Sequence, residues 1–146
     1  MVCNDAGLKK IQANPRAEIV SISVVGDDPV FMLTGPIPAS IQALKTANLT
    51  IDDMDLYEVN EAFAPVPLAW AEDLKADKSK LNVNGGAMAL GHPLGATGAK
   101  LMTTLLHEME RRESTYGLQA ICEGGGTANA TTVSYTHLRA HETHEN

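Results

Sequence analysis

The sequence predicts an α/β domain with a five-stranded, mostly parallel β-sheet, helices on both faces and an antiparallel last strand. Short runs rich in β-branched and other apolar residues alternate along the chain with stretches of helical apolar spacing. Alternation of this kind favours a parallel sheet that is covered by helices on both sides. Only a short glycine turn separates the last two strand-like runs, so we expect these two strands to pair antiparallel.

Strands are expected at five places, over residues 17–25, 56–59, 82–84, 116–122 and 128–133. The first run, AEIVSISVV, is apolar on both faces toward its end, which is typical of a buried strand. The run at 82–84 is short and leads directly into a glycine-rich segment. Three consecutive glycines, Gly124 to Gly126, separate the last two runs and allow the chain to turn.

Helices are expected over residues 39–47, from about 60 to 74 and from about 95 to 112, with the end of a further helix at 6–11. Asn60 is placed as the N-cap of the second of these helices. Pro65 and Pro67 fall within that helix and predict a kink or a delayed start. The longest helix has an apolar face made of Leu101, Met102, Leu105, Leu106 and Met109. Its charged residues, including Glu108, are expected to face water.

The composition predicts a soluble, cytoplasmic protein of one domain. The chain has 146 residues, 44% of them hydrophobic, and a formal net charge of −7 without a long basic run. This charge argues against duplex nucleic acid as a partner. No stretch approaches the roughly 18 apolar residues of a membrane span, and the first residues lack the pattern of a signal peptide. Two cysteines, Cys3 and Cys122, make no disulfide framework and fit a reducing compartment.

Three polar side chains lie at or after the ends of predicted strands and are candidates for one site. Asn60 follows residues 56–59, His92 follows residues 82–84 after a glycine-rich segment, and Cys122 ends the run at 116–122. In open α/β sheets, ligands bind at the carboxyl ends of the strands. A thiol beside an imidazole can act as a nucleophile or a general base, and the glycine N–H groups after Cys122 can form an oxyanion hole.

Each of these residues also has an ordinary structural explanation, as a helix N-cap, a loop histidine or a buried apolar thiol. Two other kinds of site are disfavoured. The site shows no compact spacing of His, Cys, Asp and Glu, so no metal is expected there. No Gly-Lys-Ser/Thr follows the glycines, which argues against a phosphate-binding nucleotide domain.

Three motifs occur in a fixed order: Asn60-Glu61-Ala62-Phe63-Ala64, then the run from Asn84-Gly85-Gly86 through Gly91-His92-Pro93 to Gly98, then Cys122 with Gly124-Gly125-Gly126. Together they closely resemble the C-terminal half of a thiolase, over about residues 17–133. The resemblance implies a five-stranded α/β domain that pairs with a similar N-terminal half. It also implies thiolytic cleavage of 3-ketoacyl-CoA or the reverse Claisen condensation of acetyl-CoA, with coenzyme A as a substrate, no cofactor, and a homo-oligomeric full-length enzyme.

The resemblance also implies a role for each candidate residue. His92 would take the proton from a nucleophilic cysteine, and Cys122 would be the acid and base at the α-carbon of the substrate. Asn60 would hold a water that, with His92, stabilises the enolate oxygen of the thioester. The N–H group of Gly124 would contribute to a second oxyanion hole. The acyl pocket would be lined by Phe63 and Met88.

The chain departs from the thiolase pattern at both ends. The nucleophilic cysteine of thiolases belongs to the N-terminal half, and Cys3 lacks its surroundings. We therefore expect residues 1–16 to be a remnant of the inter-domain junction, residues 17–133 to form the domain, and the chain alone to be inactive. Residues 134–146 resemble translated sequencing-adapter sequence and are predicted to be a non-native, disordered tail rather than a metal site built from its three histidines. The alternative function is a non-catalytic module that binds CoA thioesters or pairs with another thiolase chain.

Overall fold

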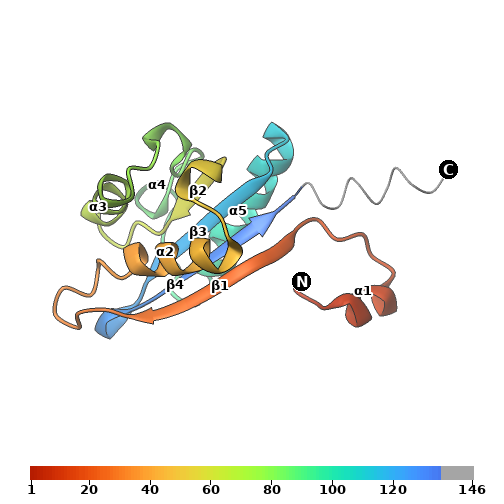
Figure 1. Cartoon of the computed structure of the whole chain (residues 1–146), viewed down its shortest axis with the longest axis horizontal. Helices are drawn as coiled ribbons and strands as arrows, with labels where there is room; N and C mark the ends of the chain where they lie inside the picture. The colour runs from red at the N-terminus through yellow and green to blue at the C-terminus, as the bar shows by residue number, and fades with distance from the viewer. Residues whose placement is uncertain (136–146) are drawn as a thin grey trace.

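The computed structural model describes residues 1–135, which form a four-stranded mixed sheet (Figure 1). The strands are β1 (Glu18–Gly26), β2 (Leu56–Val59), β3 (Tyr116–Cys122) and β4 (Thr127–Ser134), in the order β1-β4-β3-β2. Strand β4 returns from β3 through the glycine turn and enters between β3 and β1. It is antiparallel to both, as expected for the last strand, and only β2 and β3 are parallel. Two of the three strand pairs are thus antiparallel, so the sheet is mixed rather than mostly parallel as predicted, although β1, β2 and β3 run in the same direction.

The strand predicted at 82–84 does not form, because one side chain takes over its hydrogen bonds. Leu81 makes a single parallel bridge with Tyr57. The Asn82 side chain then accepts a hydrogen bond from the N–H of Val59 and donates one to the carbonyl of Val59, both at 2.9 Å. The backbone φ of Asn82 is 47°, which turns the chain away from β2. The sheet described by the structure therefore has four strands rather than the predicted five.

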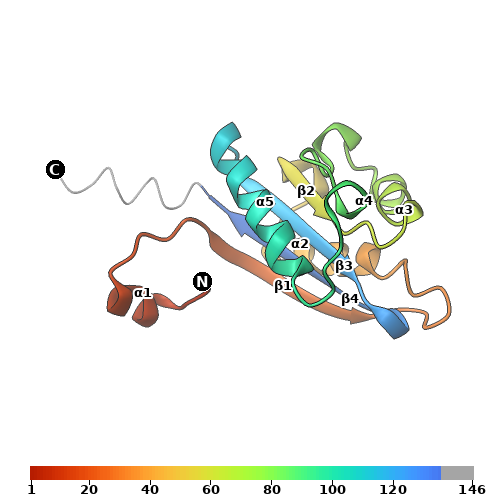
Figure 2. The same ribbon diagram turned by 180° about the vertical axis from the view of Figure 1, so that it is seen from behind.

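Helices cover both faces of the sheet, as predicted. Helix α2 (Pro36–Ala47) and helix α3 (Pro65–Leu74) lie on the face seen in Figure 1, and helix α5 (Thr97–Arg112) lies on the face seen in Figure 2. A short helix, α4 (Ala87–Leu90), interrupts the glycine-rich segment. Helix α1 (Asp5–Ile11) stands apart from the sheet in both views and has no buried residue.

The N-cap of helix α3 lies four residues later than expected, at Ala64 instead of Asn60, and this delay accommodates the two prolines of the helix. Its N-cap is Ala64, so Pro65 is the first helical residue and Pro67 the third. The N–H groups of the first turn have no intrahelical acceptor, so proline removes nothing there. Asn60 is therefore not the N-cap of this helix, which corrects the sequence-based prediction.

The core is divided between the two faces of the sheet. On the side of α2 and α3, Trp70 is fully buried and packs edge to face on Tyr57 with ring centroids 5.2 Å apart. Its indole N–H donates to the Ser40 hydroxyl at 2.8 Å, which joins α3 to α2. On the other side, a smaller cluster forms from Leu56, Leu105, Met109 and Val133. Most of the predicted apolar face of α5 thus packs on the sheet.

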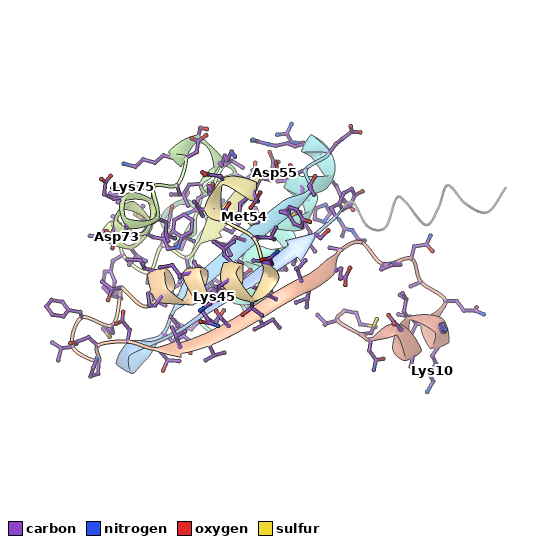
Figure 3. The ribbon with its side chains drawn as sticks, viewed as in Figure 1. Lys10, Lys45, Met54, Asp55, Asp73 and Lys75 are labelled. Atoms are coloured by element: carbon purple, nitrogen blue, oxygen red, sulfur yellow. The ribbon has the colours of Figure 1, made fainter. Side chains whose placement is uncertain are left out.

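The start of β2 is held by two neighbouring residues that are labelled in Figure 3. Met54 is fully buried. The Asp55 carboxylate accepts hydrogen bonds from the backbone N–H groups of Thr115, at 2.7 Å, and Tyr116, at 3.0 Å. These bonds join the beginning of β2 to the beginning of β3. The two strands can then run in parallel, so that their carboxyl ends open onto the same edge of the sheet.

Glu108 does not face water, contrary to the prediction from the helical pattern. It is 4% exposed, and its carboxylate accepts hydrogen bonds from Arg111 at 2.9 Å, from Asn84 at 3.0 Å and from Arg112. These donors hold the pKa of Glu108 well below its usual range, at about 2, with the Arg111 hydrogen bond as the largest cause. An ionised carboxylate here ties the start of the glycine-rich segment to α5.

Strand β4 continues one residue past the predicted domain end, to Ser134, and the Tyr135 N–H donates to the Thr115 carbonyl at 2.9 Å. The tail histidines His137, His141 and His144 lie outside the described residues. Within residues 1–135, no helix combines the length and the hydropathy that a membrane span requires.

Candidate active site

A cavity of about 640 Å³ opens at the carboxyl ends of β2 and β3. Its wall includes four of the predicted site residues: His92, Cys122, Gly124 and Phe63. The other lining residues are mainly apolar: Met32, Leu33, Ala62, Leu94, Thr97, Gly98, Ile121, Glu123 and Asn129. A largely apolar cavity with a few convergent polar groups is typical of a site for a small organic ligand. The cavity brings together residues that are up to 97 positions apart in the chain, from Met32 to Asn129.

Cys122 is the last residue of β3 and reaches the cavity as a free thiol. Its side chain is 8% exposed, and burial is the main cause that raises the pKa of the thiol above its ordinary value. The nearby Glu123 carboxylate acts in the same direction. A thiol that stays protonated suits proton donation to a carbon atom better than it suits nucleophilic attack, which needs the thiolate.

The His92 loop is held from helix α5 at two points. Gly91 has a φ of 88°, which only glycine adopts without strain, and this turn places His92 after α4. The Lys100 ammonium donates to the carbonyls of Leu90, at 2.6 Å, and Gly91, at 2.7 Å. Thr97 contacts the His92 ring directly, with 2.6 Å between the hydroxyl oxygen and Nδ1. The loop backbone and the imidazole are therefore both fixed by the first two turns of α5.

The beginning of the glycine-rich segment is held by Glu61. The Glu61 carboxylate accepts a hydrogen bond from the Asn82 side chain at 3.1 Å and one from the Met88 N–H at 3.0 Å. It also lies directly against Gly86, where a Cβ atom would collide with the carboxylate. Glycine at this position therefore permits a close approach that no other residue could make without displacing Glu61.

The turn after Cys122 requires its last two glycines for steric reasons. Gly125 and Gly126 have φ values of 77° and 84°. At Gly126, a Cβ atom would lie 2.6 Å from the Asp27 carbonyl oxygen, and the Asp27 N–H donates to the Gly126 carbonyl at 2.7 Å. Gly124, which lines the cavity, is therefore carried on a turn that is fastened to the end of β1.

Two predicted site residues, Asn60 and Met88, are not part of the cavity wall. Met88 is 66% exposed and uses its backbone N–H to hold Glu61. Asn60 continues the β2–β3 ladder through its N–H, which donates to the Ala120 carbonyl at 2.9 Å. Its side chain is 1% exposed, and neither amide atom has a hydrogen-bond partner among the described residues.

Glu58 and Gln119 form a second buried polar group on the sheet, two residues before Asn60 on β2. Glu58 is in register with Gln119 on β3, and both side chains are buried. Glu58 Oε2 and Gln119 Oε1 each have no partner among residues 1–135. Burial is the main cause that raises the pKa of Glu58 to about 8, and the negative charges of Glu61 and Glu108 add to it.

Sequence reasoning missed four positioning residues: Glu61, Asn82, Thr97 and Lys100. Their hydrogen bonds join segments that hydrophobic periodicity does not relate. Only Thr97 and Lys100 could have been suspected from the sequence. They follow His92 closely, at the start of a predicted helix, where their polar side chains can reach the loop before it. Over the part of the chain that the structure describes, no group of three His, Cys, Asp or Glu side chains could hold a metal ion. Cys3 is exposed at the start of the chain and does not line the cavity.

Comparison with known proteins identifies the family of this chain. The family described as "Thiolase, C-terminal domain" matches residues 13–135. A steroid 3-ketoacyl-CoA thiolase of Mycobacterium tuberculosis is 58% identical over 133 residues, which cover 91% of this chain and 33% of that protein. An acetyl-CoA acetyltransferase of Syntrophomonas wolfei is 54% identical over 121 residues, which cover 82% of this chain and 31% of that protein.

Solved structures agree with this assignment. The crystal structure of human mitochondrial 3-ketoacyl-CoA thiolase superposes with a TM-score of 0.88 at 48% identity, over 92% of this chain and 34% of that one. The structure of the same human protein in complex with CoA superposes with a TM-score of 0.86 at 48% identity, over 90% of this chain and 34% of that one. The chain thus spans about a third of the length of these relatives. The chain belongs to the thiolase family, in which residues 13–135 correspond to the C-terminal domain.

Proposed function

We propose that this chain supplies the C-terminal part of a thiolase active site, for thiolytic cleavage of 3-ketoacyl-CoA or the reverse Claisen condensation of acetyl-CoA. One observation carries the proposal: His92, Cys122 and Gly124 line a single cavity at the carboxyl ends of β2 and β3. The nucleophilic cysteine must come from an N-terminal half, because Cys3 is exposed and lies outside the residues that match the family.

In the cleavage direction, the first step is attack by that cysteine on the 3-keto carbon. His92 takes the thiol proton, and the bond between the α-carbon and the 3-keto carbon breaks. The products are an acyl-cysteine and the enolate of acetyl-CoA. Cys122 then donates its proton to the α-carbon, which completes acetyl-CoA. The raised pKa of the Cys122 thiol supports this role, since the proton stays on sulfur until a carbanion is present.

The second step transfers the acyl group to coenzyme A. The Cys122 thiolate takes the proton of the CoA thiol, and the resulting CoA thiolate attacks the acyl-cysteine. The bond between the acyl carbon and the cysteine sulfur breaks, acyl-CoA is formed, and the departing cysteine thiolate takes back the proton that His92 holds. The negative oxygen that forms would be stabilised by the Gly124 N–H group, which lies on the turn after Cys122. The enolate oxygen of the first step would be stabilised by His92 and by a water held on the Asn60 amide. A buried amide whose two polar atoms have no partner in the described chain fits such a water.

The apolar side of the cavity supports an acyl group as the ligand. Phe63 is 59% exposed at the cavity wall and would contact the acyl chain. Met88 lies outside the wall, so its contact with substrate would require a part of the enzyme that completes the pocket. A relative's structure in complex with CoA supports coenzyme A as the second ligand.

The experiment is to fuse this chain to the N-terminal part of the human mitochondrial 3-ketoacyl-CoA thiolase and to measure thiolysis of acetoacetyl-CoA. We expect activity in the fusion, no activity in this chain alone, and loss of activity in the His92→Ala fusion. His107→Ala is the matched control, because His107 lies on the outside of α5, beside Arg16, and is not part of the cavity wall. Activity that survives His92→Ala would contradict the role of His92. A folded fusion that binds CoA without turnover would favour a non-catalytic binding module.

A further inference from the structure

The Thr97 hydroxyl lies between the His92 ring and the backbone that carries it. Thr97 is the first residue of α5 and is 3% exposed, so its position is determined by the helix and by packing. Its hydroxyl donates to the Pro93 carbonyl at 3.0 Å. The same oxygen lies 2.6 Å from Nδ1 of His92. No other side-chain hydrogen bond of the His92 ring is found among residues 1–135.

The two contacts together decide which ring nitrogen carries the proton. A hydroxyl group has one proton, and the Pro93 carbonyl can only accept it, so both contacts can be hydrogen bonds at once only if the hydroxyl donates to Pro93. The short contact with Nδ1 is then a hydrogen bond only if the proton comes from the ring. In a neutral imidazole, a proton on Nδ1 leaves the lone pair on Nε2.

We propose that Thr97 is a positioning residue that holds His92 in the Nδ1–H tautomer, so that Nε2 is the basic nitrogen offered to the cavity. Nδ1 is occupied by Thr97, and Nε2 is the only other ring nitrogen that can take a proton. In the opposite tautomer the hydroxyl would have to donate to Nδ1 and give up its bond to the Pro93 carbonyl, which would keep only the Ala96 N–H at 2.8 Å, and Nε2 could not accept a proton. The catalytic meaning of this tautomer rests on the proposed function, but the tautomer itself does not.

A second residue of helix α5, Lys100, holds the backbone of the loop that carries His92. Lys100 lies three residues after Thr97 on the same helix and holds the Leu90 and Gly91 carbonyls just before His92. The loop backbone is therefore fixed independently of the ring contact. Removing the Thr97 hydroxyl should therefore remove the preference for a proton on Nδ1 of His92, while Lys100 keeps the loop backbone in place.

The test is a long-range ¹H–¹⁵N NMR spectrum of the whole chain labelled with ¹⁵N-histidine, at a pH where the imidazole is neutral. The His92 signals are assigned by their loss in His92→Gln. We expect a protonated Nδ1 and an unprotonated Nε2 in the unmodified chain and in Thr97→Ser, which keeps the hydroxyl. Thr97→Val keeps the shape and should shift His92 toward the Nε2–H form. Thr103→Val, an exposed site on the same helix, is the matched control and should leave the tautomer unchanged.

An Nε2–H tautomer in the unmodified chain would overturn the proposal without any variant being needed, and so would an unchanged tautomer in Thr97→Val. In the fused enzyme, Thr97→Val should lower the rate of acylation by about 10- to 100-fold, by analogy with the hydrogen-bond partners of metal-bound imidazoles, and Thr97→Ser should keep the rate of the unmodified fusion. If the fusion is inactive while the tautomer is as expected, the proposed function fails and this inference stands. If the fusion is active with the opposite tautomer, the inference fails and the proposed function stands.

Discussion

Replacing Glu58 with glutamine should remove a large part of the pH dependence of the stability of this chain. Glu58 is 2% exposed in the middle of β2 and faces Gln119 in the parallel register. Glu58 Oε2 and Gln119 Oε1 are both acceptors when Glu58 is ionised, and neither has a donor among residues 1–135. A proton on Glu58 would give this pair a donor, in agreement with the raised pKa of about 8.

The sign of the effect follows from where the proton is bound. In the unfolded chain Glu58 has a pKa of about 4.5, and in the folded chain its pKa is about 8. Between these values the folded state keeps a proton that the unfolded state has released. The free energy of unfolding therefore falls as the pH rises, by at most about 1.4 kcal/mol per pH unit, and this contribution becomes constant above about pH 8. Over the whole window the upper bound is on the order of 4–5 kcal/mol.

Glutamine has nearly the same shape, stays neutral throughout and can donate a hydrogen bond to the Gln119 oxygen. Urea unfolding at pH 5, 6.5 and 8 should show that the stability of Glu58→Gln relative to the unmodified chain increases with pH. Glu72→Gln is the matched control, because Glu72 is exposed on α3 beside Lys75, and its stability should follow the unmodified chain at all three pH values. Parallel pH profiles for Glu58→Gln and the unmodified chain would refute the reasoning, since they would mean that Glu58 is ionised in the folded state.

Three further substitutions test how the site is held. Asn82→Ala should lower the free energy of unfolding by about 1–3 kcal/mol, because the backbone N–H and carbonyl at the end of β2 lose their partner; a loss below about 0.5 kcal/mol in urea unfolding would argue against the strand-like role of this side chain. Gly86→Ala should displace the Glu61 carboxylate, so its cost should be smaller in a Glu61→Ala background, and equal costs in a double-mutant cycle would contradict direct contact. Glu108→Gln should flatten the loss of stability in acid, because the lowered pKa stabilises the fold above about pH 4.5 and this stabilisation is lost as the pH falls toward 2; unchanged acid unfolding would contradict an ionised, arginine-bound carboxylate.

The hydrophobic pattern of the sequence was sufficient to predict the two strands, β2 and β3, whose carboxyl ends border the cavity. The runs at 56–59 and 116–122 coincide with β2 and β3, because short, mainly apolar runs bounded by turn residues mark buried strands even where one polar residue, Glu58 or Gln119, interrupts them. Cys122 could therefore be placed at the carboxyl end of β3 from the sequence, whereas His92 was placed after a strand at 82–84 that does not form. The structure brings both residues to one cavity.

The elements that could not be predicted depend on single side chains that replace backbone hydrogen bonds. The Asn82 side chain bonds to the backbone of Val59 in place of a neighbouring strand. The run at 82–84 therefore lies beside β2 without forming a strand. Asn60 has the residue type of an N-cap, but the two prolines move the start of α3 to Pro65. Glu108 lies on the side of the helical pattern that is expected to face water. In the structure it is buried, and its carboxylate accepts hydrogen bonds from three side chains of two segments. Periodicity carries no information about such long-range polar contacts.

His92 and Cys122 are proposed to act at one cavity on different steps, and two half-reactions of the fused enzyme test their roles separately. Acylation can be followed by mass spectrometry as acetylation of the nucleophilic cysteine by acetyl-CoA, a step in which no proton is delivered to carbon, and α-proton exchange as loss of deuterium from the α-carbon of acetyl-CoA. We expect His92→Ala to abolish acylation. Cys122→Ser should impair exchange far more than acylation, because its proton is needed at carbon and not at the attacking sulfur. An equal loss of both half-reactions in Cys122→Ser would contradict this division of roles.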